Sequence, residues 1–279
     1  MNKLNAAIEL MRLDKPIGIY LLLWPALLAL VVGTHGNFTF VQALIVISGS
    51  ILVRSAGCVI NDLWDKDLDG GVERTRMRPI PSKKLTPVEG WIIFITLGTL
   101  SLGLLSLTNI NTLLVSIIFA IMIIIYPLTK RFFIGPQLFL GITFNPTIIV
   151  YALTEKLSNP TIFYLYFAIA AMTIAYDSFY GLCDEVDDRH LGINSTPLWW
   201  GEHTLKIIAL FQIISMSLLG VVGWLDGLSF YWFVGVMCMG GFFLHQHNLA
   251  SKKKYLLAFK NNHLMVLFIL IIAIACYSF

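Results

Sequence analysis

Long apolar stretches alternate with polar connections along the whole chain. Apolar runs of about 18 to 22 residues, the length that crosses a hydrocarbon core of about 30 Å, occur nine times. They lie at residues 17–34, 40–61, 89–107, 110–128, 135–154, 161–182, 205–223, 228–247 and 263–279. This pattern predicts an all-α membrane protein with about nine transmembrane helices, forming a single polytopic domain over residues 1–279.

The polar connections differ in length and in charge. Those after the second and sixth runs are long and acidic, whereas those after the first, third, fifth and seventh runs are short. The first acidic segment is NDLWDKDLD, at residues 61–69, and the second runs from Asp177 through Tyr180 to Asp188. Carboxylates are costly near a bilayer, so two acidic segments beside apolar runs indicate that something cationic binds between them.

Composition agrees with a membrane location, and charge predicts the orientation. The chain is 57% hydrophobic and 13% charged, with a mean hydropathy of +0.80, which lies far outside the soluble globular range. If the nine runs alternate in direction, all of the 19 lysines and arginines except Lys156 and Arg54 fall on one side. Cytoplasmic loops accumulate positive charge. We therefore expect the N-terminus and both acidic segments in the cytoplasm and the C-terminus outside.

Three further features narrow the class of protein. The basic residues lie beside the apolar runs, where membrane topology accounts for them, so nucleic-acid binding is not indicated. The four cysteines have no CxxC or His-paired spacing, so we expect neither a zinc site nor a disulfide framework. Residues 1–15 are polar and amphipathic, which predicts an interfacial helix instead of a cleavable signal peptide.

The acidic segments have the spacing of one helix face. Read as helices, Asn61, Asp65 and Asp69 recur every four residues, and Asp184 and Asp188 repeat that spacing. Carboxylate and amide oxygens without His or Cys suit hard cations, and Mg2+ is usually held by one or two carboxylates plus substrate phosphates. The two segments therefore predict a Mg2+ site that carries a diphosphate.

Cations accompany these carboxylates. Arg54 lies within an apolar run, seven residues before Asn61 and on the same face, and a buried arginine needs an anion. That anion is Asp177, another carboxylate or a substrate phosphate; a simple intramembrane salt bridge is the alternative interpretation. The other nearby cations are Arg74, Arg76, Arg78, Lys130, Arg131 and Arg189. They would help to neutralise a diphosphate, although positive-inside topology accounts for each of them as well.

An internal repeat organises the two segments. Asp65 and Asp69 follow the second of the first four apolar runs, and Asp184 and Asp188 follow the second of the next four. The spacing within the two pairs is the same. This placement predicts two pseudo-repeats, at about 15–130 and 131–250, with an extra helix at 263–279. Two such halves would bring the acidic segments face to face across a central cavity.

Separated motifs occur in order from residue 11 to about residue 200. They are MRLDKPIG at 11–18, LLWP at 22–25, RSAGCVIND at 54–62 followed by Asp65 and Asp69, RT at 74–75, RP at 78–79, YPxxKR at 126–131, PQ at 136–137, LGxxFN at 140–145, DxxYxxxDxxDD at 177–188 and GIxST at 192–196. Together they resemble the UbiA superfamily of membrane prenyltransferases, most closely its 4-hydroxybenzoate polyprenyltransferase branch.

The resemblance implies a nine-span helical fold around a central cavity, in a bacterial inner membrane. It also implies Mg2+-dependent transfer of a polyprenyl group from polyprenyl diphosphate to the ring carbon ortho to the hydroxyl of 4-hydroxybenzoate, in ubiquinone biosynthesis. By resemblance, the metal ligands are Asn61, Asp65, Asp69, Asp184 and Asp188. The implied catalytic residues are Asp177, Tyr180 and Arg54, and the implied diphosphate or substrate contacts are Arg12, Arg78, Lys130, Arg131 and Asn145.

Two departures from the family pattern affect the acceptor. Gly181 stands where Ala is usual, and Pro146-Thr147 follow Asn145 where Trp-Gly is frequent. A family member that uses homogentisate, dihydroxynaphthoate or haem is therefore an alternative. An ion-coupled transporter would also combine repeats with intramembrane acids, but its acids should lie near the bilayer midplane, whereas these cluster at one rim.

Overall fold

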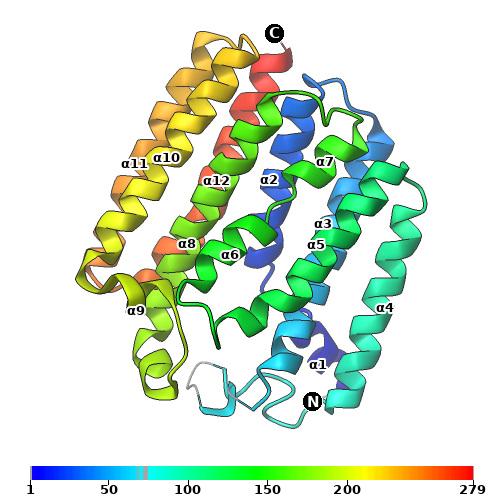
Figure 1. Ribbon diagram of the computed structural model, residues 1–279, viewed down its shortest axis with the longest axis vertical. Helices are drawn as coiled ribbons and strands as arrows, with labels where there is room; N and C mark the ends of the chain where they lie inside the picture. Colours follow the sequence, from blue (N-terminus) through cyan, green and yellow to red (C-terminus); the bar gives the residue numbers. More distant parts are fainter. Residues whose placement is uncertain (1, 68, 72–74, 279) are drawn as a thin grey trace.

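The protein is a bundle of long helices in the computed structural model, which describes residues 2–67, 69–71 and 75–278 (Figure 1). In chain order the elements are α1 (Lys3–Leu10), α2 (Ile17–Gly33), α3 (Phe40–Trp64), η1 (Asp69–Gly71), α4 (Pro87–Leu105), α5 (Ile110–Thr129), α6 (Pro136–Thr143), α7 (Thr147–Leu153), α8 (Thr161–Leu191), α9 (Thr196–Trp200), η2 (Gly201–His203), α10 (Thr204–Leu225), α11 (Phe230–Ser251) and α12 (Tyr255–Ser278). The all-α membrane fold predicted from the sequence is confirmed.

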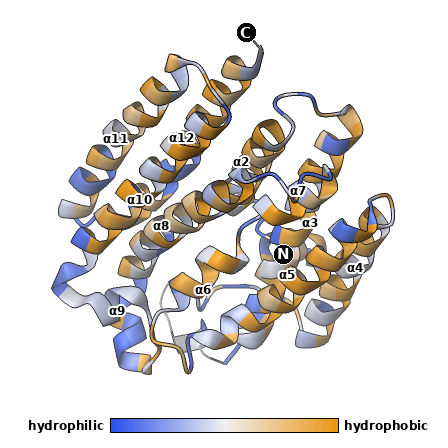
Figure 2. Cartoon of the chain, turned by 45° about the horizontal axis from the view of Figure 1, so that its top comes forward, coloured by the Kyte–Doolittle hydropathy of each residue, from blue (hydrophilic) through white to orange (hydrophobic). Residues whose placement is uncertain are grey.

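Seven stretches of the described chain are long and apolar enough to cross a membrane. They are α3, α4, α5, α6 with α7, α8, α9 through α10, and α12. Helix α2 is apolar but shorter, and α11 is not among the seven although it has 22 residues. Each of the nine runs predicted from the sequence overlaps helical structure, but the count of nine spans stays a prediction. Hydrophobic residues cover most of the long helices, whereas hydrophilic residues gather in the loops and near the helix ends (Figure 2).

The helices pack as a closed ring. Neighbours in the ring are α2 with α3, α3 with α4 and α5, α5 with α6 and α7, α6 with α8, α8 with α10, α10 with α11, α11 with α12, and α12 with α2. Helix α12 also packs against α8. The ninth run, expected as an extra helix, is thus the element that joins the last helices of the chain to the first.

Two helices extend beyond the membrane thickness and carry the acidic segments at their C-terminal ends. Helix α8 has 31 residues, or about 46 Å, whereas about 20 residues cross a hydrocarbon core of about 30 Å. Helix α3 has 25 residues and begins with a capping box formed by Thr39 and Gln42. Their last turns therefore project at the end of the bundle that also holds α1 and the N-terminus (Figure 1).

Helix α1 is docked on the protein. Ala6 and Leu10 are buried in a hydrophobic cluster with Val59, Ile60 and Leu63 of α3. The polar N-terminal helix expected to lie at the interface therefore packs against the end of α3 that carries the first acidic segment.

Candidate active site

The first acidic segment begins on α3 and continues as a turn. Helix α3 ends at Trp64, and Asp65 is its C-cap. Asp69 lies in η1, so the prediction of one helix through Asp69 is wrong. Several carboxylates at the C-terminal end of a helix are unfavourable, because they oppose the helix dipole. The backbone N–H of Asp65 donates to Asn61 O (2.9 Å), and the backbone N–H of Asp69 donates to Asp65 O (2.8 Å). Hydrogen bonds to the fourth preceding residue therefore continue from Asn61 to Asp69, past the end of α3. Asp65 and Asp69 are both buried.

Lys130 and Arg131, at the end of α5, bind this segment. Lys130 Nζ lies 2.5 Å from Asp65 Oδ2, and Arg131 Nη2 donates to the Trp64 carbonyl (2.6 Å). Burial raises the pKa of Asp65, and the ion pair with Lys130 opposes that shift. Two of the cations expected near the diphosphate are thus already held at the first acidic segment.

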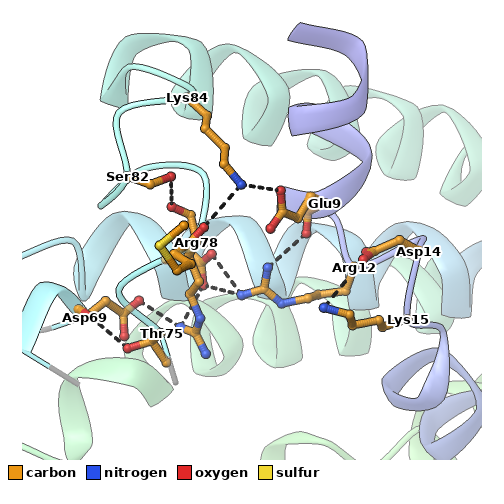
Figure 3. Close-up of polar contacts among 11 residues, drawn as sticks. Glu9, Arg12, Asp14, Lys15, Asp69, Thr75, Arg78, Ser82 and Lys84 are labelled. Atoms are coloured by element: carbon orange, nitrogen blue, oxygen red, sulfur yellow. Dashed lines mark hydrogen bonds and ion pairs between the residues drawn. The ribbon is translucent and has the colours of Figure 1, made fainter. Parts of the chain in front are cut away.

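The two predicted arginines Arg12 and Arg78 meet at Asp62. Arg12 Nη2 lies 3.0 Å from both carboxylate oxygens of Asp62, and Arg78 Nη1 lies 3.0 Å from Asp62 Oδ1 and 2.7 Å from Asp69 Oδ2. Figure 3 shows Arg12 beside Arg78, with Asp69 on the far side of Arg78. Arg74, another cation expected here, lies outside the described residues.

The second acidic segment is one continuous helix. Helix α8 runs through Asp177, Tyr180, Asp184 and Asp188 to Leu191, so the expected one-face spacing of the two last aspartates is confirmed. Gly192 ends the helix in the left-handed conformation (φ 65°), which glycine adopts without a Cβ penalty. The helix thus presents its acidic residues on successive turns toward the rim.

The loop after the second acidic segment lies beside Lys130 and Arg131, which bind the first. The backbone N–H of Asn194, just after α8, donates to the Lys130 carbonyl (2.9 Å). A cavity of about 250 Å³ beside it is lined by Asp67 and Arg131 from one side and by Leu191, Gly192 and Ile193 from the other. The loops that follow the two segments therefore share one rim.

Arg54 lies deeper in the bundle and faces α8. It interacts electrostatically with Tyr176, Asp177 and Tyr180, and its guanidinium carbon lies 5.2 Å from the centre of the Phe144 ring. Its Nε is buried and has no hydrogen-bond partner among the described residues. Asp177 was one of the three anions expected for Arg54 from the sequence, and which of them it binds stays a prediction; the buried Nε is suited to an anion.

Asn145 has a local role in the fold. Its side-chain nitrogen donates to Tyr166 O (2.8 Å), and its oxygen accepts from the Thr147 backbone N–H and hydroxyl (3.2 and 2.8 Å). It is buried at the break between α6 and α7, where Pro146 cannot continue a helix. Both ends of the amide therefore bind the protein, and the substrate contact expected from the sequence stays a prediction.

Sequence reasoning gave no role to three residues at the site. The sequence places Asp62 in the first acidic segment without a role of its own, whereas in the structure its carboxylate accepts from two arginines. Tyr126 interacts electrostatically with Asp177 and Arg54, and also with Asp65 of the first acidic segment. Gly18 lies against the Arg54 guanidinium. All three fall within the quoted motifs, but spacing within one helix does not reveal contacts between helices.

The oxygen ligands fit a hard cation. In the described part of the chain no three His, Cys, Asp or Glu side chains gather around one metal position, because Asp65 and Asp69 pair with Lys130 and Arg78. However, Asp65 Oδ1 is buried and has no hydrogen-bond partner within the described residues. Carboxylate and amide oxygens alone favour Mg2+ over softer metals.

A family model confirms the resemblance seen in the motifs. The model described as the UbiA prenyltransferase family matches residues 22–272. The chain belongs to the UbiA prenyltransferase family. It is 40% identical to a 4-hydroxybenzoate octaprenyltransferase of Psychromonas ingrahamii, over 92% of this chain and 90% of that one. It is 39% identical to the protein of the same name from Vibrio vulnificus, over 93% and 92%.

Solved UbiA structures share the fold at low sequence identity. The apo UbiA homolog from Aeropyrum pernix K1 superposes with a TM-score of 0.80 at 20% identity, covering 90% of this chain and 94% of that chain. A UbiA homolog from Archaeoglobus fulgidus bound to GPP and Mg2+ superposes with a TM-score of 0.75 at 18% identity, covering 98% and 100%. The ring of helices is therefore the UbiA fold, and the protein is an integral membrane protein.

Proposed function

We propose that this protein transfers a polyprenyl group from polyprenyl diphosphate to the carbon ortho to the hydroxyl of 4-hydroxybenzoate, in ubiquinone biosynthesis. The observation that carries the proposal is that the first acidic segment and the loop after the second meet at Lys130 and Arg131, on one rim, with Arg54 near Asp177 deeper in the bundle. The names of the relatives that are about 40% identical supply the acceptor.

The rim binds the diphosphate. Asn61, Asp65, Asp69, Asp184 and Asp188 would hold Mg2+, which when bound polarises the diphosphate oxygens and stabilises the leaving group. Lys130, Arg131 and Arg78 pair with carboxylates or backbone oxygens in the structure. They would exchange those partners for phosphate oxygens, so that positive charge surrounds the diphosphate as it leaves.

The deeper pocket binds the acceptor and completes the reaction. Breaking the C1–O bond of the donor leaves an allylic cation, and the acceptor carbon ortho to the hydroxyl forms the new C–C bond. Arg54 would bind the acceptor carboxylate through its buried guanidinium. Asp177, with Tyr180 beside it, would accept the ring proton that restores aromaticity, or the departing diphosphate would do so.

Water must be kept from the allylic cation. The long cytoplasmic connections would cover the rim, and a water-excluded pocket strengthens the electrostatic interactions inside it. The rings of Phe144 and Tyr180 lie near Arg54, where ring faces would stabilise a cation. The donor tail would remain in lipid.

The same proposal includes the orientation and the internal repeat. Positive-inside topology supports a cytoplasmic N-terminus and an outside C-terminus in a bacterial inner membrane. The two halves at about 15–130 and 131–250 would each contribute one acidic segment, from the end of α3 and the end of α8.

The experiment is prenyl transfer by purified protein in detergent or liposomes. Radiolabelled 4-hydroxybenzoate and a polyprenyl diphosphate are supplied with Mg2+ or EDTA, to the wild type, Asp65→Ala and Asp184→Ala. Glu185→Ala is the matched control, because Glu185 is on the next position of α8 and pairs with Arg189 (3.0 Å). A metal-dependent lipid-soluble product, lost only in the two aspartate variants, supports the proposal. Transfer to homogentisate, dihydroxynaphthoate or a haem precursor instead would contradict the acceptor, and inertness to all acceptors would favour a transporter.

A further inference from the structure

Asp62 is a buried carboxylate at the rim. It lies on the last turn of α3, between Asn61 and Asp65, and is 1% exposed. Both of its oxygens accept from Arg12, and one also accepts from Arg78. A buried carboxylate that receives two guanidinium groups holds them close together, although their like charges would otherwise repel.

Arg78 connects Asp62 to a predicted metal ligand. The same nitrogen of Arg78 contacts Asp62 Oδ1 (3.0 Å) and Asp69 Oδ2 (2.7 Å), and its side chain is largely buried. The orientation of Asp69 therefore depends on Arg78, and that of Arg78 on Asp62. Such outer partners fix the geometry of metal-binding carboxylates.

Arg12 connects Asp62 to the N-terminal helix. It follows α1 in a left-handed turn (φ 58°), and its Nη1 donates to the Glu9 carbonyl near the end of α1 (2.9 Å). Glu9 in turn pairs with Lys84 (3.1 Å), on the loop that follows Arg78 (Figure 3). Three segments distant in sequence, namely α1, the end of α3 and the loop after η1, are thus joined at Asp62.

We infer that Asp62 is a positioning residue that presents Arg12 and Arg78 to the diphosphate and holds Asp69 in place. The inference rests on the proposed function, because it assigns a role within the same diphosphate site. Asp62 does not bind the ligand itself. Its charge fixes the two arginines, whose planar guanidinium groups bind phosphate with defined geometry only when they are oriented.

The direction in which Asp62→Asn changes the affinity for pyrophosphate distinguishes this role from a simple charge effect. Asp62→Asn removes a negative charge near a bound anion, so charge alone predicts tighter binding of pyrophosphate. Loss of positioning predicts weaker binding, with the dissociation constant raised about 10-fold or more, as for other outer-shell residues. The measurement is calorimetric titration of purified full-length protein in detergent with pyrophosphate at saturating Mg2+.

Asp14→Asn is the matched control. Asp14 lies two residues from Arg12 in the same loop, with its side chain 36% exposed and 3.8 Å from Lys15, so the charge change is the same without the buried contacts. We expect pyrophosphate to bind this variant as it binds the wild type. Equal weakening in both variants would overturn the inference, because the loss of affinity would then not depend on the buried contacts of Asp62 with the two arginines.

Arg12→Gln, alone and combined with Asp62→Asn, tests whether Asp62 acts through Arg12. If Asp62 acts through Arg12, the double variant weakens pyrophosphate binding less than the two single effects combined. Fully additive effects would overturn that path. In prenyl transfer, Asp62→Asn should raise the KM for polyprenyl diphosphate while the KM for 4-hydroxybenzoate changes little, whereas general misfolding would affect both. If Asp62→Asn does not fold, Arg12→Lys decides the question: it keeps the charge but loses the two-oxygen contact, so positioning still predicts weaker binding.

The wild-type titration separates failure of the proposed diphosphate site from failure of the role of Asp62. A wild type that fails to bind pyrophosphate with Mg2+ would overturn the proposed diphosphate site and with it this inference. Normal wild-type binding, with unchanged or tighter binding by Asp62→Asn, would overturn the role of Asp62 alone.

Discussion

The contact between Gly18 and Arg54 gives the sharpest prediction about the acceptor pocket. Gly18 is on the first turn of α2, and a Cβ added there would lie 2.4 Å from Arg54 Nε and 2.6 Å from Nη2. Ordinary van der Waals contacts begin at 3.4 Å. Gly18→Ala therefore displaces the guanidinium by on the order of 1 Å, away from the position in which it faces Asp177 and Tyr180.

A displacement of this size should affect catalysis more than stability. A misplacement of about 1 Å can lower the rate about 100-fold, which corresponds to about 2.7 kcal/mol of transition-state stabilisation. Overpacking destabilises the folded state by about 1 to 3 kcal/mol. Replacing glycine by alanine within a helix stabilises it by about 1 kcal/mol. We expect kcat/KM for 4-hydroxybenzoate to fall about 100-fold, while the KM for polyprenyl diphosphate stays within about 2-fold.

The assay is steady-state prenyl transfer with each substrate varied in turn, together with thermal unfolding in detergent. Gly98→Ala is the control, because Gly98 is inside α4 and an added Cβ would meet nothing within 4 Å. The control should retain wild-type kinetics. Wild-type kcat/KM for 4-hydroxybenzoate in Gly18→Ala would refute the assignment of Arg54 to the acceptor.

Three further outcomes follow from other contacts. Lys130→Met leaves the buried Asp65 carboxylate without its 2.5 Å partner, so prenyl transfer should fall about 100-fold, with partial activity retained by Lys130→Arg. Burial raises the pKa of the Asp226 carboxyl, in the loop after α10, above its ordinary value of 3.8. The folded state therefore binds the carboxyl proton more tightly than the unfolded state does. The stabilisation that this proton gives the fold is lost as pH rises through the raised pKa. Asp226→Asn should accordingly raise the Tm more at pH 7 than at pH 4, which thermal unfolding at both values would check. Gln246→Leu breaks a buried network between α10, α11 and α12, and unfolding should show a loss of about 0.6 to 1.7 kcal/mol with prenyl transfer unchanged at low temperature.

Hydrophobic periodicity was sufficient to predict the helices because a bilayer allows few alternatives. Backbone groups in hydrocarbon must be satisfied within the segment, so a long apolar run is a helix. The exceptions lie where local chemistry overrides the run. Pro146 divides the fifth run into α6 and α7, and carboxylates end α3 at Trp64 before the acidic segment is complete.

The departure at Gly181 shows what periodicity omits. The sequence identified this glycine only as a difference from the Ala usual in the family. In the structure, a Cβ at Gly181 would lie 3.1 Å from Gln137 Nε2 and from Pro197, on α6 and α9. Gln137 also accepts from the Thr196 backbone N–H (2.8 Å). Helix α8 therefore approaches both elements closely just before its acidic turns, and an alanine would require them to move.

The same limit applies to the site itself. Helical spacing places Asp184 and Asp188 on one face, because both belong to one helix. It says nothing of Asp62, whose partners Arg12 and Arg78 come from the turn after α1 and the loop after η1. One-dimensional spacing therefore predicts which oxygens line up along a helix, whereas the charge that orients them comes from segments that only the folded chain brings together. For this reason variants at the contacts between these segments, such as those of Asp62 with Arg12 and Arg78, should alter diphosphate affinity by changing how the side chains are oriented.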